Sequence, residues 1–286
     1  MEMKIVYLLI QIQQYIFQIL IFPRVNETKS NIYFASDFHL GAPDWETSLI
    51  REKKIIAWLN EIEKDAKEIY FLGDVFDFWF EYKHVIPKGF VRLLGKLANL
   101  SDAGVKLHFF TGNHDMWLFD YLQKELGAEV YQKIIMRKIQ NSVFFIGHGD
   151  GLGPGDLKYK ILKKFFRSKI CQWAFARIHP NFGIGLANFL SKRSRISTGD
   201  NDEKFLGKEN EWLYQYSKEI KKTLKVDYFI FGHRHLPMEL KVDDATYFNI
   251  GEWMKYCTFA VFDGKDLCLK KWEDGKIQPF IFHEDE

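Results

Sequence analysis

Five short clusters of carboxylate, carboxamide and imidazole side chains are spread through the sequence, and each directly follows a mainly apolar run. One of them, Gly112-Asn113-His114-Asp115, follows the run at residues 105–110. The other clusters contain Asp37 and His39, Asp74 and Asp77, His148 and Asp150, and His233 and His235. Oxygen and imidazole donors of this kind bind divalent metal ions. The clusters therefore predict one metal site built from segments that lie far apart in the sequence.

No single cluster is specific, because an Asp-x-His or His-x-His pair occurs often by chance. Their joint occurrence, each at the end of an apolar run, is much more specific. The candidate metal ligands are Asp37, His39, Asp74, Asn113, His148, His233 and His235. Seven ligands are too many for one ion and suit two ions that share a carboxylate. Two ions roughly 3.5–4 Å apart orient a hydroxide nucleophile and bind phosphoryl oxygens during in-line displacement, which predicts phosphoester hydrolysis.

The segments between the clusters show which elements must position them. Helical spacing of apolar residues predicts helices over residues 47–64, 90–100, 117–126 and 209–224. The apolar runs predict strands, and further strands are expected over residues 132–138, 142–146, 247–250, 258–262 and 267–272. This alternation predicts an α/β fold, and the strand-rich C-terminal end predicts a second sheet packed on the first. In such sheets ligands bind beyond the carboxyl ends of the strands, where each cluster lies.

Composition limits the fold and the compartment. The chain has 286 residues, of which 47% are hydrophobic, so it can bury a full core, and its length fits one large domain with an insertion. The net charge of +2 gives no indication about nucleic acid. The three cysteines, Cys171, Cys257 and Cys268, have no ligand spacing, which suits a reducing compartment. His108 lies inside a predicted strand, and we expect it to pack in the core.

Residues 1–30 form an apolar extension and a polar linker, ahead of a domain predicted over residues 31–286. On a helix, Gln11, Gln14 and Gln18 would fall on one face and apolar side chains on the other. These glutamines disfavour a membrane-spanning helix. The low positive charge near the start and the lack of a small-residue cleavage site disfavour a secretory signal. Two interpretations stay open: a helix that lies on a membrane surface, or an extension without function that reflects an upstream start codon.

One segment departs from the alternating pattern. Residues 157–196 contain ten lysines and arginines and no acidic residue, with aromatic residues interleaved. Apolar spacing of i, i+4 predicts amphipathic helices here, within an insertion over about residues 152–208 that follows the fourth cluster. Such an insertion would be a lid for an anionic ligand with an apolar portion, or a membrane-facing surface. A basic-aromatic strip also suits nucleic acid, and a solvated helical insertion without a ligand is a further alternative.

The five clusters together resemble the sequence blocks of the calcineurin-like metallophosphoesterases. These blocks are Asp37-x-His39, Gly73-Asp74-x-x-Asp77, Gly112-Asn113-His114-Asp115, Gly147-His148 and Gly232-His233-x-His235. The resemblance implies a four-layer αββα sandwich of two mixed sheets with a helical lid insertion. It implies one ion held by Asp37, His39, Asp74 and His235, and a second held by Asp74, Asn113, His148 and His233. It also implies that His114 acts as the catalytic acid or stabilises the transition state, with Asp115 orienting it.

Further details resemble one branch of that superfamily, the UDP-2,3-diacylglucosamine hydrolase family. They are Asp37-Phe38-His39-Leu40-Gly41, Asp77-Phe78-Trp79, the step from His148-Gly149-Asp150 into the basic insertion, and His233-Arg234-His235-Leu236-Pro237. The resemblance implies cleavage of UDP-2,3-diacylglucosamine to UMP and 2,3-diacylglucosamine 1-phosphate in lipid A biosynthesis. It implies two divalent ions, for which we expect Mn²⁺, and a cytoplasmic protein bound peripherally to the inner membrane. The implied substrate contacts are Asn113, His114, Asp156, Tyr159, Arg167, Ser194 and Arg195.

Several points stay open at the level of sequence. The proteobacterial branch of that family has arginine where His114 stands here, so the chemistry at this position follows either the branch or the wider superfamily. Asp77 either takes part in the site or caps the turn after Asp74. The alternative function is that of a nuclease, another phosphodiesterase or another pyrophosphatase of the same superfamily. The expected partners are a nucleotide-linked glycolipid and a membrane surface, without nucleic acid or an obligate protein partner.

Overall fold

Two mixed β-sheets form the centre of the protein, in a computed structural model that describes residues 29–153, 157–198 and 204–284, with only the backbone described for residues 192–198. The first sheet has the strand order β12-β11-β10-β1-β2-β3-β4. Its strands are β1 (Asn31–Ala35), β2 (Ala66–Phe71), β3 (Lys106–Phe110), β4 (Glu129–Tyr131), β10 (Thr258–Phe262), β11 (Leu267–Glu273) and β12 (Lys276–Pro279). The second sheet has the order β5-β6-β7-β9-β8. Its strands are β5 (Ile135–Ile139), β6 (Ser142–Ile146), β7 (Tyr228–Phe231), β8 (Met238–Val242) and β9 (Ala245–Asn249).

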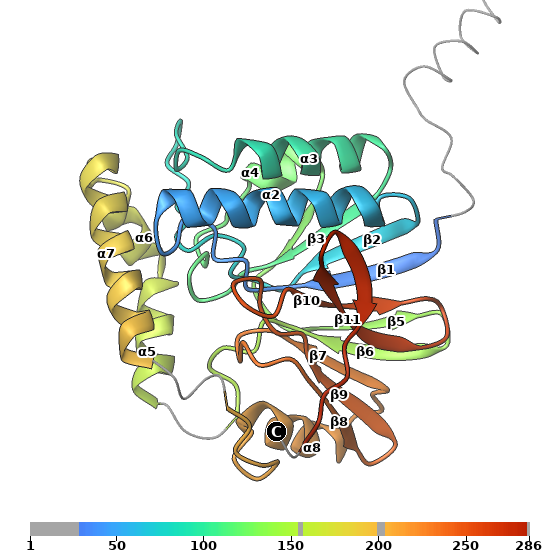
Figure 1. The fold of residues 1–286 in the computed structure, drawn as a ribbon. Helices are drawn as coiled ribbons and strands as arrows, with labels where there is room; N and C mark the ends of the chain where they lie inside the picture. Colours follow the sequence, from blue (N-terminus) through green and yellow to red (C-terminus); the bar gives the residue numbers. More distant parts are fainter. Residues whose placement is uncertain (1–28, 154–156, 199–203, 285–286) are drawn as a thin grey trace, which may run out of the picture.

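Helices cover the outer face of each sheet, which gives four layers (Figure 1). Helices α2 (Trp45–Ile62), α3 (Val91–Asp102) and α4 (Tyr121–Leu126) pack on the first sheet, and α8 (Trp212–Lys221) packs on the second. Successive side chains of a strand point to opposite faces of the sheet. Tyr33 and Ala35 of β1 therefore pack with the helices, whereas Ile32 and Phe34 pack between the two sheets. The predicted α/β sandwich of two mixed sheets is confirmed.

Parallel pairing brings the ends of the ligand-bearing strands to one edge of each sheet. β1 pairs in parallel with β2 and β2 with β3 in the first sheet, and β6 pairs in parallel with β7 in the second. Each of these strands leads at its carboxyl end into one of the five clusters. The same edge of the fold therefore carries clusters that are up to 198 positions apart, from Asp37 to His235.

The predicted helices and most of the predicted strands are confirmed, and the differences lie at their ends and at sheet edges. The helix predicted over residues 117–126 begins only at Tyr121, because Trp117 instead forms a β-bridge with Phe80. The strand predicted from residue 132 begins at Ile135. Sequence patterns do not predict β4, β8 or β12, each of which ends a sheet. Edge strands pair on one side only, so their apolar alternation is weak.

Three helices occupy the interval between β6 and α8. They are α5 (Leu157–Phe166), α6 (Lys169–Phe175) and α7 (Pro180–Thr198), and they lie beside the carboxyl edge of the sheets (Figure 1). The indole of Trp117 attaches them to the sandwich: its Nε1 donates to the carbonyl oxygen of Phe166 at 2.9 Å, and its ring packs against Phe175 with 4.7 Å between centroids. These contacts hold the insertion beside the loop that follows β3.

Among the described helices, none is both long enough and apolar enough to cross a membrane. The predictions for the N-terminal extension concern residues 1–28, which lie outside the described part of the chain.

Candidate metal centre

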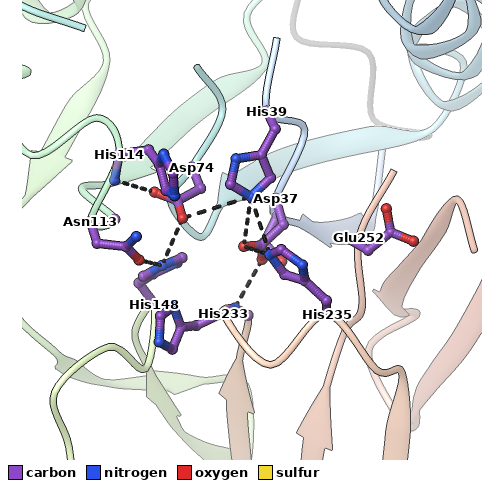
Figure 2. Close-up of polar contacts among 12 residues, drawn as sticks. Asp37, His39, Asp74, Asn113, His114, His148, His233, His235 and Glu252 are labelled. Atoms are coloured by element: carbon purple, nitrogen blue, oxygen red, sulfur yellow. Dashed lines mark hydrogen bonds and ion pairs between the residues drawn. The ribbon is translucent and has the colours of Figure 1, made fainter. Parts of the chain in front are cut away.

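All seven predicted metal ligands lie together at the carboxyl edge of the sheets (Figure 2). They come from five separate loops, and their side chains point towards a common region. Three groups have donor atoms within 4.8 Å of one another: Asp37, His39 and His235; Asp74, His148 and His233; and His39, Asp77 and His114. The strand ends therefore bring the predicted ligands into reach of one another, as the sequence pattern requires.

In the first group, two imidazoles approach one carboxylate. Nε2 of His235 lies 3.2 Å from Oδ1 of Asp37, and Nε2 of His39 lies 3.7 Å from the same oxygen. The two Nε2 atoms are 3.2 Å apart. Oδ1 of Asp37 is buried and accepts no hydrogen bond from any described residue. A buried carboxylate oxygen without a donor costs free energy, and a divalent cation between this oxygen and the imidazoles would compensate it.

Asp74 joins the first group to the second. Its Oδ2 lies 3.3 Å from Nε2 of His148 and 3.9 Å from Nε2 of His39. Oδ1 of Asn113 lies 3.2 Å from Nε2 of His148, and the rings of His148 and His233 meet edge to face with 5.0 Å between centroids. One carboxylate oxygen thus stands between two sets of nitrogen and oxygen donors, where a carboxylate shared by two ions would stand.

The ligand loops adopt strained backbone conformations. Five of the predicted ligands have φ angles between 37° and 65°, namely Asp37, His39, Asp74, His233 and His235. This left-handed region costs a residue other than glycine on the order of 1–3 kcal/mol, and such residues cluster at functional sites. Hydrogen bonds between loops maintain the conformation, as where the amide of His39 donates to the carbonyl oxygen of Asp74 at 2.9 Å. The fold therefore stores strain at the positions that aim these side chains inwards.

Two glycines make room for the carboxylates. A Cβ atom at Gly112 would lie 2.1 Å from Oδ1 of Asp74, and one at Gly232 would lie 2.5 Å from Oδ2 of Asp37. In this space the amide of His114 donates to Oδ1 of Asp74 at 2.8 Å, and the amide of residue 233 donates to Oδ2 of Asp37 at 2.9 Å. Each carboxylate therefore gives one oxygen to the backbone and directs the other towards the imidazoles.

Opposite charges stabilise one another in this buried site. Burial would raise the pKa of Asp74, but the positive charge of His148 and the neighbouring imidazoles hold that pKa well below its usual range, and the same holds for Asp37. In spite of its burial, the charge of Asp74 raises the pKa of His148 to about 10, whereas burial and the charge of His148 lower the pKa of His233 to about 4. Nδ1 of His148 donates to the carbonyl oxygen of Leu72 at 2.7 Å, which directs Nε2 to the ligand group. A cation that binds here would displace the proton on Nε2.

Asp115 connects two ligand loops. Its oxygens accept hydrogen bonds from the amides of Gly112 and Val75, both at 2.8 Å. Burial and the nearby charge of Asp74 raise the pKa of this carboxyl to about 7. The resemblance implies that Asp115 orients His114. Among the described residues its carboxylate accepts from these two amides, in the loops after β2 and β3, and makes no hydrogen bond with His114.

Asp77 and a serine from the insertion surround His114. Nδ1 of His114 lies 3.1 Å from the carbonyl oxygen of Asp77 and 2.9 Å from Oγ of Ser191 in α7. Oγ of Ser191 donates to Oδ2 of Asp77 at 2.9 Å. Oδ1 of Asp77 lies 3.4 Å from Nδ1 of His39 and 3.6 Å from Nδ1 of His114. Asp77 therefore contacts the rings of a predicted ligand and of the predicted catalytic residue, which answers the question that the sequence leaves open.

The residues predicted to contact substrate from the insertion are only partly described. Asp156 lies outside the described residues, and so do the side chains of Ser194 and Arg195. The hydroxyl of Tyr159 donates to Oδ2 of Asp150 at 2.6 Å. Nη2 of Arg167 donates to Oγ1 of Thr111 at 2.9 Å. Tyr159 and Arg167 thus lie at the ends of β6 and β3, next to the ligand loops.

Sequence patterns do not single out two further ion pairs at the site. Nζ of Lys163 lies 2.6 Å from Oδ2 of Asp150, two residues after His148. Nε and Nη2 of Arg234 each lie 3.1 Å from an oxygen of Glu211, a buried pair that attaches the loop after β7 to the start of α8. Arg234 directly follows a predicted ligand and Asp150 lies two positions after one, which is a signal in the sequence, but their partners lie 23 and 13 positions away.

The chain is similar to several known proteins. Residues 30–237 match the family model of the calcineurin-like phosphoesterases. A Porphyromonas gingivalis protein named UDP-2,3-diacylglucosamine hydrolase is 41% identical over 261 residues, covering 86% of this chain and 99% of that protein. A Vibrio vulnificus protein of the same name is 26% identical over 209 residues, covering 71% and 80%. A solved archaeal phosphodiesterase aligns with 84% of this chain and 98% of its own, at 18% identity and a TM-score of 0.43. Because the family model spans most of its length, the chain belongs to the calcineurin-like phosphoesterase family.

Proposed function

We propose that this protein is a dimetal hydrolase that cleaves the pyrophosphate bond of UDP-2,3-diacylglucosamine and releases UMP and 2,3-diacylglucosamine 1-phosphate. The 41% identity to the P. gingivalis hydrolase supports the substrate. The observation that carries the chemistry is the position of Asp74, whose Oδ2 stands between Nε2 of His39 and Nε2 of His148. A carboxylate between two sets of donors is what a pair of ions acting on one phosphoester needs.

We assign the two ions to the two ligand sets. The first set is Asp37, His39, Asp74 and His235, and the second is Asp74, Asn113, His148 and His233. Bound there, two divalent ions would supply an activated nucleophilic water and offset the negative charge that develops on the phosphate. Carboxylate, carboxamide and imidazole donors without a thiolate are consistent with Mn²⁺, which we propose as the native metal.

His114 is the proposed catalytic residue of the chain itself. Its Nδ1 is occupied by Asp77 and Ser191, which leaves Nε2 for the substrate. A phosphate beside this ring favours the imidazolium form, because opposite charges attract in a site with little water. Nε2–H then donates to the leaving oxygen of the diphosphate, as a hydrogen bond or as a full proton. Asp77 is the positioning residue, since it holds the ring through Nδ1.

We propose that α5, α6 and α7 form a lid that receives the acyl chains and rests on the membrane. Large apolar side chains on these helices are exposed, namely Leu157, Ile161, Leu162, Phe165, Ile170, Trp173, Phe182, Leu186, Phe189 and Leu190. Lysines accompany them along α5 and at the start of α6. Apolar side chains flanked by cations suit acyl chains and anionic headgroups. The proposed location is the cytoplasmic face of the inner membrane.

Product analysis tests the proposed reaction. The Mn²⁺-loaded protein is incubated with UDP-2,3-diacylglucosamine, with UDP-N-acetylglucosamine and with a nitrophenyl diester. We expect UMP and the lipid 1-phosphate from the acylated substrate and much slower turnover of the other two. Cleavage of the diester with the lipid left intact would keep the metal centre and contradict the lipid substrate.

Vesicle binding tests the membrane proposal. Phe182 and Phe189 are 66% and 60% exposed on α7, so changing both to serine removes apolar surface without opening a core. We expect partitioning onto anionic vesicles to fall at least ~10-fold, because each lost aromatic contact contributes about 1.5–3 kcal/mol when fully buried. The matched control changes Ile50 and Val91, which are 67% and 70% exposed on α2 and α3, to serine. Equal binding by the two double variants would contradict the proposal.

A further inference from the structure

A cavity of about 320 Å³ adjoins the second ligand set. It begins at His148 and Asp150 and lies between the loop before β5 and the end of α5. Gln132, Lys133 and Arg167 also line it. Its volume falls within the range of small-molecule sites, roughly 300–1,000 Å³. Because His148 belongs to both the cavity and the ligand set, one molecule can place a phosphate at the metal centre and another part in the cavity.

Hydrogen bonds fix the walls of this cavity. Nη1 of Arg167 donates to the carbonyl oxygen of Gln132 at 2.6 Å, and Nη2 donates to Oγ1 of Thr111 at 2.9 Å. Nε of Arg167 is buried and has no hydrogen-bond partner among the described residues. Nζ of Lys163 is held by Asp150 at 2.6 Å. The guanidinium group therefore joins α5 to the loop before β5, and it retains one donor that no described residue satisfies.

The charge of the cavity favours an anion. Three cations line it, Lys133, Lys163 and Arg167, against the single carboxylate of Asp150. The ammonium group of Lys133 makes no ion pair within the described part of the chain. Cations around a concave site raise the local concentration of anionic ligands. This balance suits a phosphorylated group and disfavours an acyl chain.

The remaining lining suits a nucleobase. The side chain of Gln132 makes no hydrogen bond with a described residue, and its carboxamide offers one acceptor and two donors. Such a group pairs with the N3–H and O4 atoms of uracil. Ile134, Leu152 and Phe110 add apolar surface to the same cavity. Apolar faces with a few polar groups are the usual composition of a site for a flat heterocycle.

We propose that this cavity binds the nucleoside monophosphate half of the substrate, with the base near Gln132 and the phosphate between Lys133 and the second ligand set. The inference rests on the proposed function, because it assigns the two halves of that substrate to different places. The nucleotide lies in the charged cavity beside His148, and the acyl chains lie against the exposed apolar side chains of α5–α7. The cleaved bond would then lie between the two regions, at Asp74.

Equilibrium binding of nucleotides to the Mn²⁺-loaded protein tests the cavity without turnover. Lys133→Glu should raise the Kd for both UMP and AMP about tenfold, because it reverses one of three cations around the phosphate. Gln132→Leu should reduce the preference for UMP over AMP towards equal binding, because it removes the carboxamide but keeps the size of the side chain. Lys138→Glu, on the exposed side of β5 and outside the cavity lining, is the control and should leave both Kd values unchanged.

The outcomes separate this inference from the proposed function. Weaker UMP binding in Lys133→Glu, together with lost base preference in Gln132→Leu, supports the cavity even if another diphosphate proves to be the substrate. Turnover of the diacylated lipid with unchanged UMP binding in both variants overturns the cavity alone. A wild-type protein that binds UMP and AMP equally well, or neither of them, also overturns it.

Discussion

The ligand loops and the helical insertion face each other across the site, and they are built in opposite ways. Asp37, Asp74 and His148 are almost completely buried, each makes a hydrogen bond with a backbone amide or carbonyl, and the backbone of the two aspartates is strained. In contrast, none of the side chains of α5 or α6 is fully buried. The two regions therefore meet different physical demands within one fold.

The difference agrees with what each region is proposed to bind. Metal ligands must stay within a few tenths of an ångström of their positions, so the sandwich holds them on rigid strand ends. Apolar chains of a lipid impose no such directionality, because the hydrophobic effect depends on the area removed from water and not on angles. An insertion with exposed apolar surface and few buried contacts can adapt to such a ligand.

The largest expected effect lies in the ligand loops. Asp74→Ala should abolish metal loading and turnover together, because Oδ2 of Asp74 serves both ligand sets. Metal content by elemental analysis and phosphate-ester turnover measure the two effects. Asp120→Ala, at an exposed aspartate that pairs with Lys124, is the control and should keep both properties. A variant of Asp74 that is active and fully loaded with metal would contradict the assignment of Asp74 to both ligand sets.

The next effect separates catalysis from metal binding within the same region. His114→Ala should keep both ions but turn over at least ~100-fold more slowly, the usual cost of a lost proton donor or oxyanion contact. The ring of His114 contributes no atom to the two assigned ligand sets, so the metal content should stay at the wild-type level. Near-normal turnover would remove this residue from the mechanism.

A smaller effect is expected where the two regions touch. Ser191→Ala should lower kcat about five- to tenfold with little change in KM, because the lost hydroxyl leaves Nδ1 of His114 with only the contacts of Asp77. Ser191→Thr keeps the hydroxyl and should restore most of kcat. An increase in KM without a change in kcat would instead indicate that Ser191 contacts the substrate.

Inside the sandwich we expect a substitution to change the stability of the fold and to leave activity unchanged. Glu68 lies 3.1 Å from Nε2 of His108 and 3.3 Å from Nη2 of Arg137. Despite partial burial, these groups lower the pKa of Glu68 to about 2, from 4.5 in the unfolded chain. The interaction therefore stabilises the fold above pH 4.5 and is lost as the pH falls from there towards 2.

Glu68→Gln should accordingly lower the free energy of unfolding by about 2–3 kcal/mol at pH 7 and by less at pH 3.5. Urea unfolding at the two pH values measures this difference, and turnover at pH 7 should stay unchanged. A constant difference at both pH values would show that the carboxylate acts through packing and not through its charge. His108 itself is buried in β3 and stacks on Tyr70 with 4.1 Å between centroids, which confirms its predicted packing role.

Much of the fold could be predicted because its signals are local. The apolar runs before Asp37, Asp74 and Asn113 are buried strands that end where the polar residues begin. Short edge strands such as β4 and β12 escape prediction, since their few residues are stabilised by a neighbour on one side only. The helical pattern predicts the start of α4 four residues too early, because it includes the apolar Trp117, which instead pairs with Phe80.

The sequence by itself determined which side chains could bind metal, because residue type and position after a strand are properties of a short stretch of chain. Only the tertiary structure decided what surrounds them. Asp77 contacts both His39 and His114, Asp115 holds backbone amides, and Ser191 reaches the site from 77 positions beyond His114. Partners at such separations depend on how the layers pack and on how the loops are directed, and no local pattern records that geometry.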